Sequence, residues 1–163
     1  MKQEIAERLK AEKELRTLSV GAESLVFALE AKDKYSVWHS RRVMRIAMAV
    51  WKRMNLFEED MEDLHYGSLL HDVGKIAVDQ LIQNKTSTLT PNEYVHIMIH
   101  VQAGAEIVKP IVNNKVVALI EHHHDQYQSD SSEQTLAGED ISLGKRIIAL
   151  ADAFDAMTSN RSY

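Results

Sequence analysis

Glycine and proline are scarce in this chain, and their scarcity narrows the folds that it can adopt. The sequence holds 6 glycines and 2 prolines among 163 residues, whereas these two types together make up about 12% of an average protein. Their shortage favours helices joined by few tight turns. One predicted helix, over 36–54, carries inward-facing side chains at intervals of three and four: His39, Val43, Ile46, Val50 and Met54. The sequence therefore predicts an all-α fold.

Composition excludes several classes of protein. The chain contains no cysteine, so disulfides, four-cysteine zinc sites and cysteine nucleophiles are excluded. The 19 basic and 24 acidic residues give a net charge of −5, which argues against generic binding to duplex nucleic acid. The longest fully apolar stretch, 46–51, is far shorter than the ~18 residues of a spanning helix, and no signal peptide is visible. We expect a cytoplasmic protein with no membrane span.

The first 18 residues form a charged segment ahead of the main domain, which we place at 19–163. Ile5, Leu9 and Leu15 stand among many lysines and glutamates at a spacing that permits a helix but holds no heptad repeat. Two interpretations stay open. The segment is either a solvated helix packed on the domain, or a linker helix that pairs with a second copy or a sensor domain.

Further helices are predicted from their start and stop signals. One covers 58–73, is acidic at its start and has Gly74 as the residue that ends it, which places His71 and Asp72 in its last turn. The others start at the capping box of Thr90-Pro91-Asn92-Glu93, in a short apolar segment between Gly104 and Pro110, at Asn113 and at Ser142. The Asn113 helix should extend to about His124, and the last helix carries two carboxylates, Asp152 and Asp155.

Seven side chains on these helices carry the nitrogen and oxygen donors that hold first-row divalent metals. They are His39, His71, Asp72, His100, His123, His124 and Asp152. Seven ligands exceed the need of one ion, whereas two octahedral ions that share a bridging carboxylate would use them all. Two such ions activate water and clamp a phosphoryl group, which indicates phosphate ester hydrolysis. Asp155 either orients a ligand or Lys75, or simply bonds a nearby backbone group.

These residues stand in motifs by which the chain from Ala28 to Tyr163 resembles the HD-GYP subgroup of the HD-domain metal-dependent phosphohydrolases. The matching stretches are Ala28-Leu29-Glu30-Ala31-Lys32-Asp33 with His39-Ser40, Leu69-Leu70-His71-Asp72-Val73-Gly74-Lys75-Ile76, Asn84-Lys85 with Leu89-Thr90-Pro91-Asn92-Glu93, His100 with Gly104-Ala105-Glu106-Ile107, His123-His124, and 151–159 with Arg161 and Tyr163. This ordered set covers most of the sequence.

The resemblance implies an HD-domain helical bundle with a binuclear metal site in its core. One ion would be held by His39, His71, Asp72 and Asp152. Asp72 would bridge to a second ion, held by His100, His123 and His124. Iron and manganese are the favoured metals, while zinc, nickel, cobalt and magnesium remain open.

The resemblance also implies contacts to a substrate, which in family terms is cyclic di-GMP. Lys75 would grip a phosphate and act in catalysis together with Asp72, and Arg161 would face the phosphates. Tyr127, next to the paired histidines in sequence, is a candidate for stacking on a base.

The chain departs from the family pattern in three places. Ser131-Ser132-Glu133 replaces the Gly-Tyr-Pro tripeptide, which alters the angles open to the loop, removes a tyrosine contact and adds a negative charge. Tyr35 stands where some members place a glutamate for a third metal, so two ions are predicted. Relatives continue past Tyr163, so part of the domain is expected beyond this residue.

The sequence thus predicts an enzyme, a metal-dependent phosphodiesterase that hydrolyses a cyclic dinucleotide in bacterial second-messenger signalling. Two alternatives stay open. The chain could instead be an HD phosphohydrolase for another nucleotide or small phosphoester, or a catalytically silent signalling module that contains metal. Turnover of a substrate separates the first two possibilities from the third.

Overall fold

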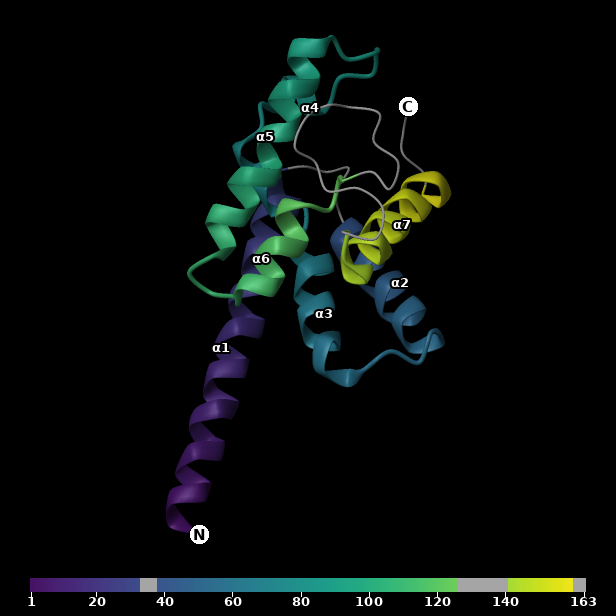
Figure 1. Ribbon diagram of the computed structural model, residues 1–163. Helices are drawn as coiled ribbons and strands as arrows, with labels where there is room; N and C mark the ends of the chain where they lie inside the picture. Colours follow the sequence, from purple (N-terminus) through teal and green to yellow (C-terminus); the bar gives the residue numbers. More distant parts are fainter. Residues whose placement is uncertain (33–37, 126–140, 160–163) are drawn as a thin grey trace.

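Every regular element in this computed structural model, which describes residues 1–32, 38–125 and 141–159, is a helix (Figure 1). The elements are α1 (Lys2–Lys32), α2 (His39–Arg53), the 3₁₀ helix η1 (Glu58–Asp60), α3 (Met61–Leu70), the 3₁₀ helix η2 (Val73–Ala77), α4 (Gln80–Gln83), α5 (Pro91–Val108), α6 (Asn114–Glu121) and α7 (Leu143–Thr158). Within these ranges no residue lies in a β-strand, and the predicted all-α class is confirmed.

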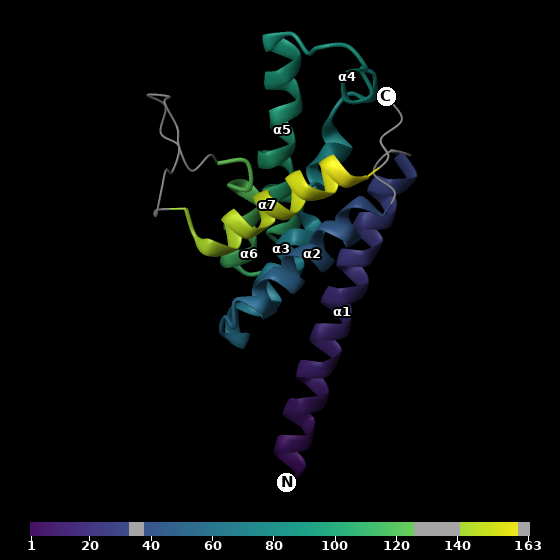
Figure 2. The ribbon, with the colours of Figure 1, turned by 90° about the vertical axis from the view of Figure 1, so that its right-hand side faces the viewer.

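The short helix α3 lies at the centre of the bundle, where it contacts α1, α2, α6 and α7 (Figures 1 and 2). Leu69 and Leu70 join a hydrophobic core with side chains of α1, α5 and α6. Leu64 joins a second core with side chains of α2, α6 and α7. Because apolar groups cover most of its circumference, α3 is stable only when other helices surround it. Its C-terminal end therefore delivers His71 and Asp72 to the middle of the protein.

The prediction that Gly74 ends a helix over 58–73 is wrong. The α-helix ends at Leu70, and Gly74 lies inside η2 with a φ outside the left-handed region. A Cβ atom on Gly74 would lie 1.9 Å from the carbonyl oxygen of His100 and 2.4 Å from the amide nitrogen of Gly104. The glycine is needed because the backbone of η2 crosses directly against α5, and this crossing brings Asp72 beside His100.

The capping box at the start of α5 is confirmed. The Thr90 hydroxyl accepts a hydrogen bond from the Glu93 amide at 3.3 Å, and the Glu93 carboxylate accepts one from the Thr90 amide at 2.8 Å. The separate short helix expected after Gly104 is wrong, since α5 continues through it to Val108. Gly104 faces η2 instead, where an added Cβ would lie 3.3 Å from the Gly74 nitrogen. Both glycines thus permit close packing.

The last two helices start at the predicted positions. The Asn113 side chain accepts a hydrogen bond from the Val116 amide at 3.1 Å and caps α6. However, α6 ends at Glu121, so the paired histidines lie just beyond it. Ser142 occupies the N-cap position of α7, although its side chain makes no capping hydrogen bond.

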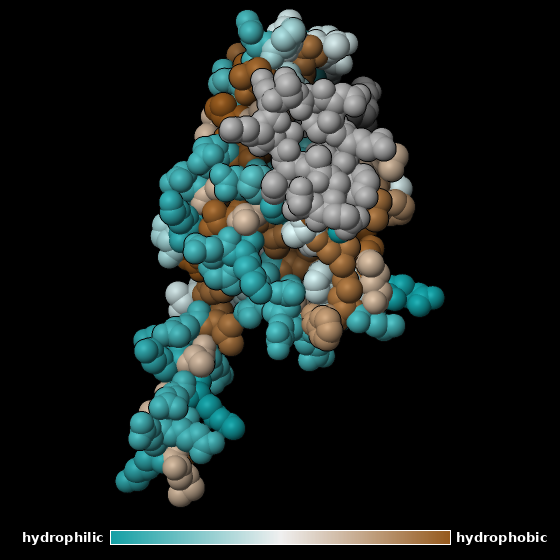
Figure 3. Space-filling view, in the orientation of Figure 1, coloured by the Kyte–Doolittle hydropathy of each residue, from teal (hydrophilic) through white to brown (hydrophobic). Residues whose placement is uncertain are grey.

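Helix α1 runs unbroken from Lys2 to Lys32, past the predicted division at residue 18, which stays a prediction. Residues 1–17 are all exposed and form a mainly hydrophilic projection (Figure 3). Farther along, Ala22, Val26 and Leu29 are buried against the bundle. The Lys32 ammonium donates to the carbonyl oxygens of Ile76 and Val78 at 2.7 and 2.8 Å, which ties α1 to η2. Among the described helices, none is both long and apolar enough to cross a membrane.

Candidate metal centre

The seven predicted ligands gather in one place although they come from five parts of the chain. They lie at the start of α2, at the end of α3, on α5, just after α6 and on α7. Two compact groups result, in each of which the candidate ligand atoms lie within 4.8 Å of one another. The first group is His39, His71 and Asp72, and the second is His100, His123 and His124.

Asp72 stands between the two groups. Its Oδ2 atom lies 3.4 Å from His39 Nε2 and 3.5 Å from His71 Nε2. Its Oδ1 atom lies 3.7 Å from His100 Nε2. Asp72 is 2% exposed, so each carboxylate oxygen faces a different set of buried imidazoles. This placement suits a carboxylate that serves two ions.

Three of the histidines have their tautomers fixed by the helical turn before them. The Nδ1–H groups of His71 and His100 donate to the carbonyl oxygens of Ser68 and Ile97, both at 2.7 Å. His123 donates in the same way to the Ile120 carbonyl at 2.6 Å. A neutral imidazole that donates from Nδ1 carries its lone pair on Nε2. All three rings therefore present a potential metal ligand atom to the centre.

His39 has a different support because it is the first residue of α2 and has no preceding turn of that helix. Its Nδ1 lies 2.7 Å from Oδ2 of Asp155, a carboxylate that is 2% exposed. Arg42 donates to both oxygens of the same carboxylate, from Nε at 2.6 Å and from Nη2 at 3.0 Å. Asp155 thus orients a candidate ligand, which was one of the two roles that the sequence left open.

Many of the buried nitrogen and oxygen atoms of the centre are hydrogen-bond acceptors, and this indicates which chemical group fits between them. His71 Nε2 is buried and has no hydrogen-bond partner among the described residues. The Nε2 atoms of His100 and His123 lie 3.4 Å apart, although both rings use their Nδ1–H elsewhere. His39 Nε2 lies 3.2 Å from Oδ1 of Asp152 without hydrogen-bond geometry. Buried lone pairs that face one another are costly, and a cation between them removes the cost. The residues therefore fit divalent metal ions.

The pKa values of these groups show that the two halves of the centre differ in charge. Burial lowers the pKa of His39, but the nearby carboxylates of Asp152, Asp72 and Asp155 outweigh it and raise the pKa to about 10. Burial lowers the pKa of His100 to about 4, against the attraction of Asp72, and it lowers the pKa of His123 well below the usual value. Positive charge is therefore favoured near the carboxylates, while the second group consists of neutral imidazoles.

The exposed edge of the centre holds Lys75 and His124. The Lys75 ammonium lies 2.6 Å from Oδ2 of Asp72, and a quarter of the side chain is exposed. His124 is exposed on its side of the centre, and the Asp152 side chain is 27% exposed. A ligand from solvent can therefore reach this edge of the centre without unfolding a helix.

Arg161, Tyr127, Tyr35 and the segment 131–133 lie outside the described residues. Sequence reasoning missed Arg42, which holds Asp155 in place. The available signal was its position one helical turn after His39, which mirrors the spacing of Asp155 after Asp152 on α7.

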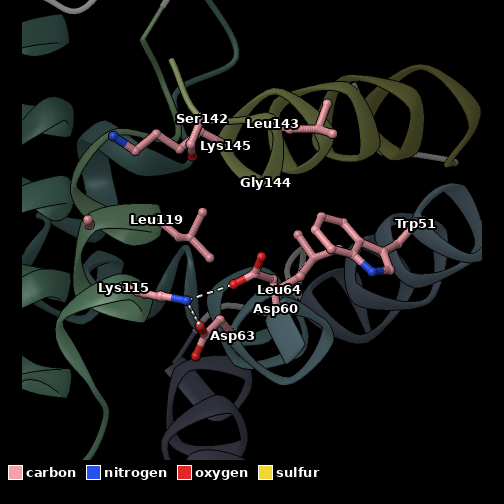
Figure 4. Close-up of a pocket in the computed structure, with 11 residues that line it drawn as sticks. Trp51, Asp60, Asp63, Leu64, Lys115, Leu119, Ser142, Leu143, Gly144 and Lys145 are labelled. Carbon is pink, nitrogen blue, oxygen red and sulfur yellow. Dashed lines mark hydrogen bonds and ion pairs between the residues drawn. The ribbon is translucent and has the colours of Figure 1, made fainter. Parts of the chain in front are cut away.

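A separate cavity of about 470 Å³ lies near the first turn of α7 (Figure 4). Trp51, Leu64 and Leu119 line it, and the ion pair of Lys115 with Asp60, at 2.7 Å, lies among its lining residues. None of its lining residues is a candidate metal ligand. The cavity is therefore distinct from the metal centre.

Comparisons with known proteins agree with this geometry. Residues 37–157 match the HD domain family. The chain is 34% identical over 137 residues to a cyclic di-GMP phosphodiesterase of Pseudomonas aeruginosa. The aligned region covers 83% of this chain and 33% of that protein. It is 31% identical over 143 residues to a 3'3'-cGAMP-specific phosphodiesterase of Vibrio cholerae. This alignment covers 86% of this chain and 27% of that protein. The chain thus spans about a third of the length of these relatives or less.

A solved structure has a similar fold. The HD domain of the phosphodiesterase PgpH from L. monocytogenes superposes with a TM-score of 0.63 at 17% identity. The match covers 85% of this chain and 76% of that one. At this identity the likeness concerns the arrangement of helices alone, and it agrees with the predicted helical bundle.

Proposed function

Because this chain belongs to the HD-domain family, we propose that it is a metal-dependent phosphodiesterase that hydrolyses a cyclic dinucleotide, with cyclic di-GMP as the first candidate. The names of the relatives agree with the HD-GYP resemblance of the motifs. The observation that carries the proposal is the set of buried Nε2 lone pairs directed at both oxygens of Asp72. A centre of this kind suits two cations that act on a phosphate.

We assign the ligands in two sets that share Asp72. The first set is His39, His71, Asp72 and Asp152, and the second is His100, His123 and His124. Two divalent ions there would supply Lewis acidity toward a phosphodiester and a nucleophile from water at neutral pH. Iron and manganese suit this mixture of imidazole and carboxylate, and the donor set is free of the thiolates that soft ions prefer.

Lys75 is the proposed phosphate contact. Its ammonium already lies at the edge of the centre, 2.6 Å from Asp72, and remains partly exposed. In this position it can orient Asp72 and can donate to a phosphate oxygen, where a cation stabilises the charge that develops during hydrolysis. Arg161 and Tyr127 remain proposed contacts to the phosphates and to a base.

The identity of the dinucleotide is open because the relatives differ in it. One relative is named for cyclic di-GMP and another for 3'3'-cGAMP. Ser131-Ser132-Glu133 replaces the Gly-Tyr-Pro of the HD-GYP pattern, which favours a test of both compounds. The proposed location is the cytoplasm, and residues 1–17 of α1 are the proposed contact for a second copy or a sensor domain, since all are exposed.

Turnover and metal content together test this proposal. Protein loaded with Mn²⁺ or Fe²⁺ is incubated with cyclic di-GMP, 3'3'-cGAMP and a chromogenic phosphodiester, with His71→Ala as the blank. We expect two ions per chain by elemental analysis and hydrolysis of at least one cyclic dinucleotide. Hydrolysis of the chromogenic ester alone would favour another phosphoester as substrate. Two bound ions without any turnover would identify a silent module.

The role of Lys75 has a matched control in this chain. Lys75→Ala should reduce kcat strongly while leaving two ions bound, since its nitrogen is a phosphate contact and no ligand. Lys85 is similarly exposed and lies 2.6 Å from a carboxylate of its own, Glu93, so Lys85→Ala should leave kcat within about twofold. If Lys75→Ala loses its metal along with its activity, the phosphate role is wrong.

A further inference from the structure

We propose that Arg42 and Asp155 are positioning residues that fix the tautomer and direction of His39. The first ligand set then depends on a side-chain relay, whereas His100 and His123 of the second set are held by backbone carbonyls. This inference rests on the proposed function, because His39 matters as a ligand only if the centre holds metal. Its physical content, however, concerns the protein before any metal binds.

The relay is built by the packing of α2 on α7. His39 and Arg42 lie one turn apart on α2, and Asp152 and Asp155 lie one turn apart on α7. Two helical pairs of this spacing present both members on one face. As a result, Asp152 faces the Nε2 side of the His39 ring at 3.2 Å, while Asp155 faces the Nδ1 side at 2.7 Å.

Asp155 can hold the ring in only one tautomer. Its Oδ2 atom lies 2.7 Å from His39 Nδ1 and accepts from Arg42 Nη2 at 3.0 Å, while Oδ1 accepts from Arg42 Nε at 2.6 Å. The bidentate contact with a guanidinium keeps the carboxylate ionised and fixes its plane. An ionised carboxylate only accepts, so Nδ1 must carry a proton, and in the neutral ring the lone pair is therefore on Nε2.

The other buried histidines reach the same tautomer by a route that no side chain can change. His71, His100 and His123 donate to backbone carbonyls of their own preceding turns. A substitution at Asp155 should therefore affect one ring and leave three unchanged. Outer partners of metal-bound histidines typically contribute 10- to 100-fold in metal affinity, and this contribution should fall on the first set alone.

Asp155→Asn is the most direct test because an amide cannot make all three contacts. With its oxygen toward Arg42 Nε, the amide nitrogen would face Nδ1 and favour the Nε2–H tautomer, which cannot bind metal. With its oxygen toward His39, the amide nitrogen would oppose Arg42 Nε–H. Asp63→Asn is the matched control, since Asp63 is also a buried carboxylate, 9% exposed, and accepts from Asn113 at 2.6 Å in another part of the bundle.

The first measurement uses metal-free protein and ¹⁵N NMR of the histidine side chains. Wild type and Asp63→Asn should show His39 with its proton on Nδ1 or on both nitrogens, whereas Asp155→Asn should show a population with Nε2 alone protonated. The signals of His71, His100 and His123 should stay unchanged. A His39 signal in Asp155→Asn identical to that of wild type would overturn the relay.

The second measurement is a calorimetric Mn²⁺ titration. Asp155→Asn should weaken one of two binding events by about 10- to 100-fold and leave the other unaltered. Arg42→Gln, at a side chain that is 38% exposed, should give a weaker effect in the same event without endangering the fold. Equal weakening of both events, or of neither, would contradict the inference. If wild type binds no metal, the proposed function fails, while the NMR measurement still decides the role of Asp155.

Discussion

The two ligand groups differ in how the protein holds them. The first group, His39, His71 and Asp72, is entirely buried and depends on contacts between distant helices. The second group lies on α5 and just beyond α6, and two of its rings are fixed by the backbone of their own helices. One of its members, His124, is exposed. Backbone contacts within one helix therefore fix His71 of the first group as well as His100 and His123 of the second. His39 alone among these four rings is held by a side chain from a distant helix.

The largest expected effect comes from Asp72, which lies between the two groups. Asp72→Ala removes the carboxylate that faces His39 and His71 with one oxygen and His100 with the other. We expect no stably bound ion and no activity above background. By contrast, His71→Ala and His123→Ala should each retain about one ion, in different groups.

Elemental analysis of the three variants, with circular dichroism to confirm the helical fold, measures this difference. Retention of two ions by Asp72→Ala would show that the groups are independent and that Asp72 bridges nothing.

A smaller but still large effect is expected at the crossing of η2 and α5. In Gly74→Ala the new methyl group would meet two backbone atoms, at 1.9 and 2.4 Å, so η2 must move away from α5 and carry Asp72 away from His100. We expect a loss of about 3 kcal/mol in the free energy of unfolding. Gly21→Ala is the control, because an added Cβ there meets nothing within 4 Å.

Gly21 lies in the interior of α1. The free energy of unfolding of Gly21→Ala should therefore rise by about 0.5–1 kcal/mol, because alanine has the higher helix propensity. Urea denaturation of both variants measures the pair, and equal stabilities would refute the packing role of Gly74.

The pH dependence of the metal-free protein should separate the two groups with a more modest effect. The pKa of His39 rises from 6.5 in the unfolded chain to about 10, so the folded state binds the extra proton and stability falls as pH rises from 6.5 toward 10. The pKa of His100 falls to about 4, so the unfolded state binds the extra proton and stability falls as pH drops from 6.5 toward 4.

The free energy of unfolding should therefore peak near pH 6.5 and fall by up to a few kcal/mol on each side. His39→Gln should flatten the alkaline side and His100→Gln the acid side, as measured by thermal unfolding with a chelator present. An alkaline side that stays steep in His39→Gln would mean that another group titrates there.

Much of the fold could be predicted because its signals are local. The capping box at Thr90 and the Asn113 cap depend only on neighbouring residues, and both occur at the predicted positions. In the sequence Gly74 and Gly104 look like local helix signals, but each is required by the chain segment that packs against it. A glycine required for close approach looks the same in sequence as one that ends a helix.

The candidate metal centre likewise combines features that depend on neighbouring residues with features that depend on the packing of distant helices. The kinds of side chain that bind metal, and their placement on inward faces, followed from residue chemistry and helical spacing. The contact of Asp155 with His39, and the presence of Arg42 behind it, could not be assigned because α2 and α7 are distant in sequence. Their register against each other depends on how Val43, Ala47 and Ile148 pack in the shared core.

The amino-acid sequence by itself determined that this protein is helical and which seven side chains are its candidate nitrogen and oxygen ligands. These properties depend on residue chemistry and on intervals of three or four residues, so a linear reading is enough. Only the tertiary structure decided that Asp72 lies between two groups of imidazoles and that Asp155 sets the direction of one of them. Such distances between side chains are fixed when whole helices pack together, and no short stretch of sequence contains that information.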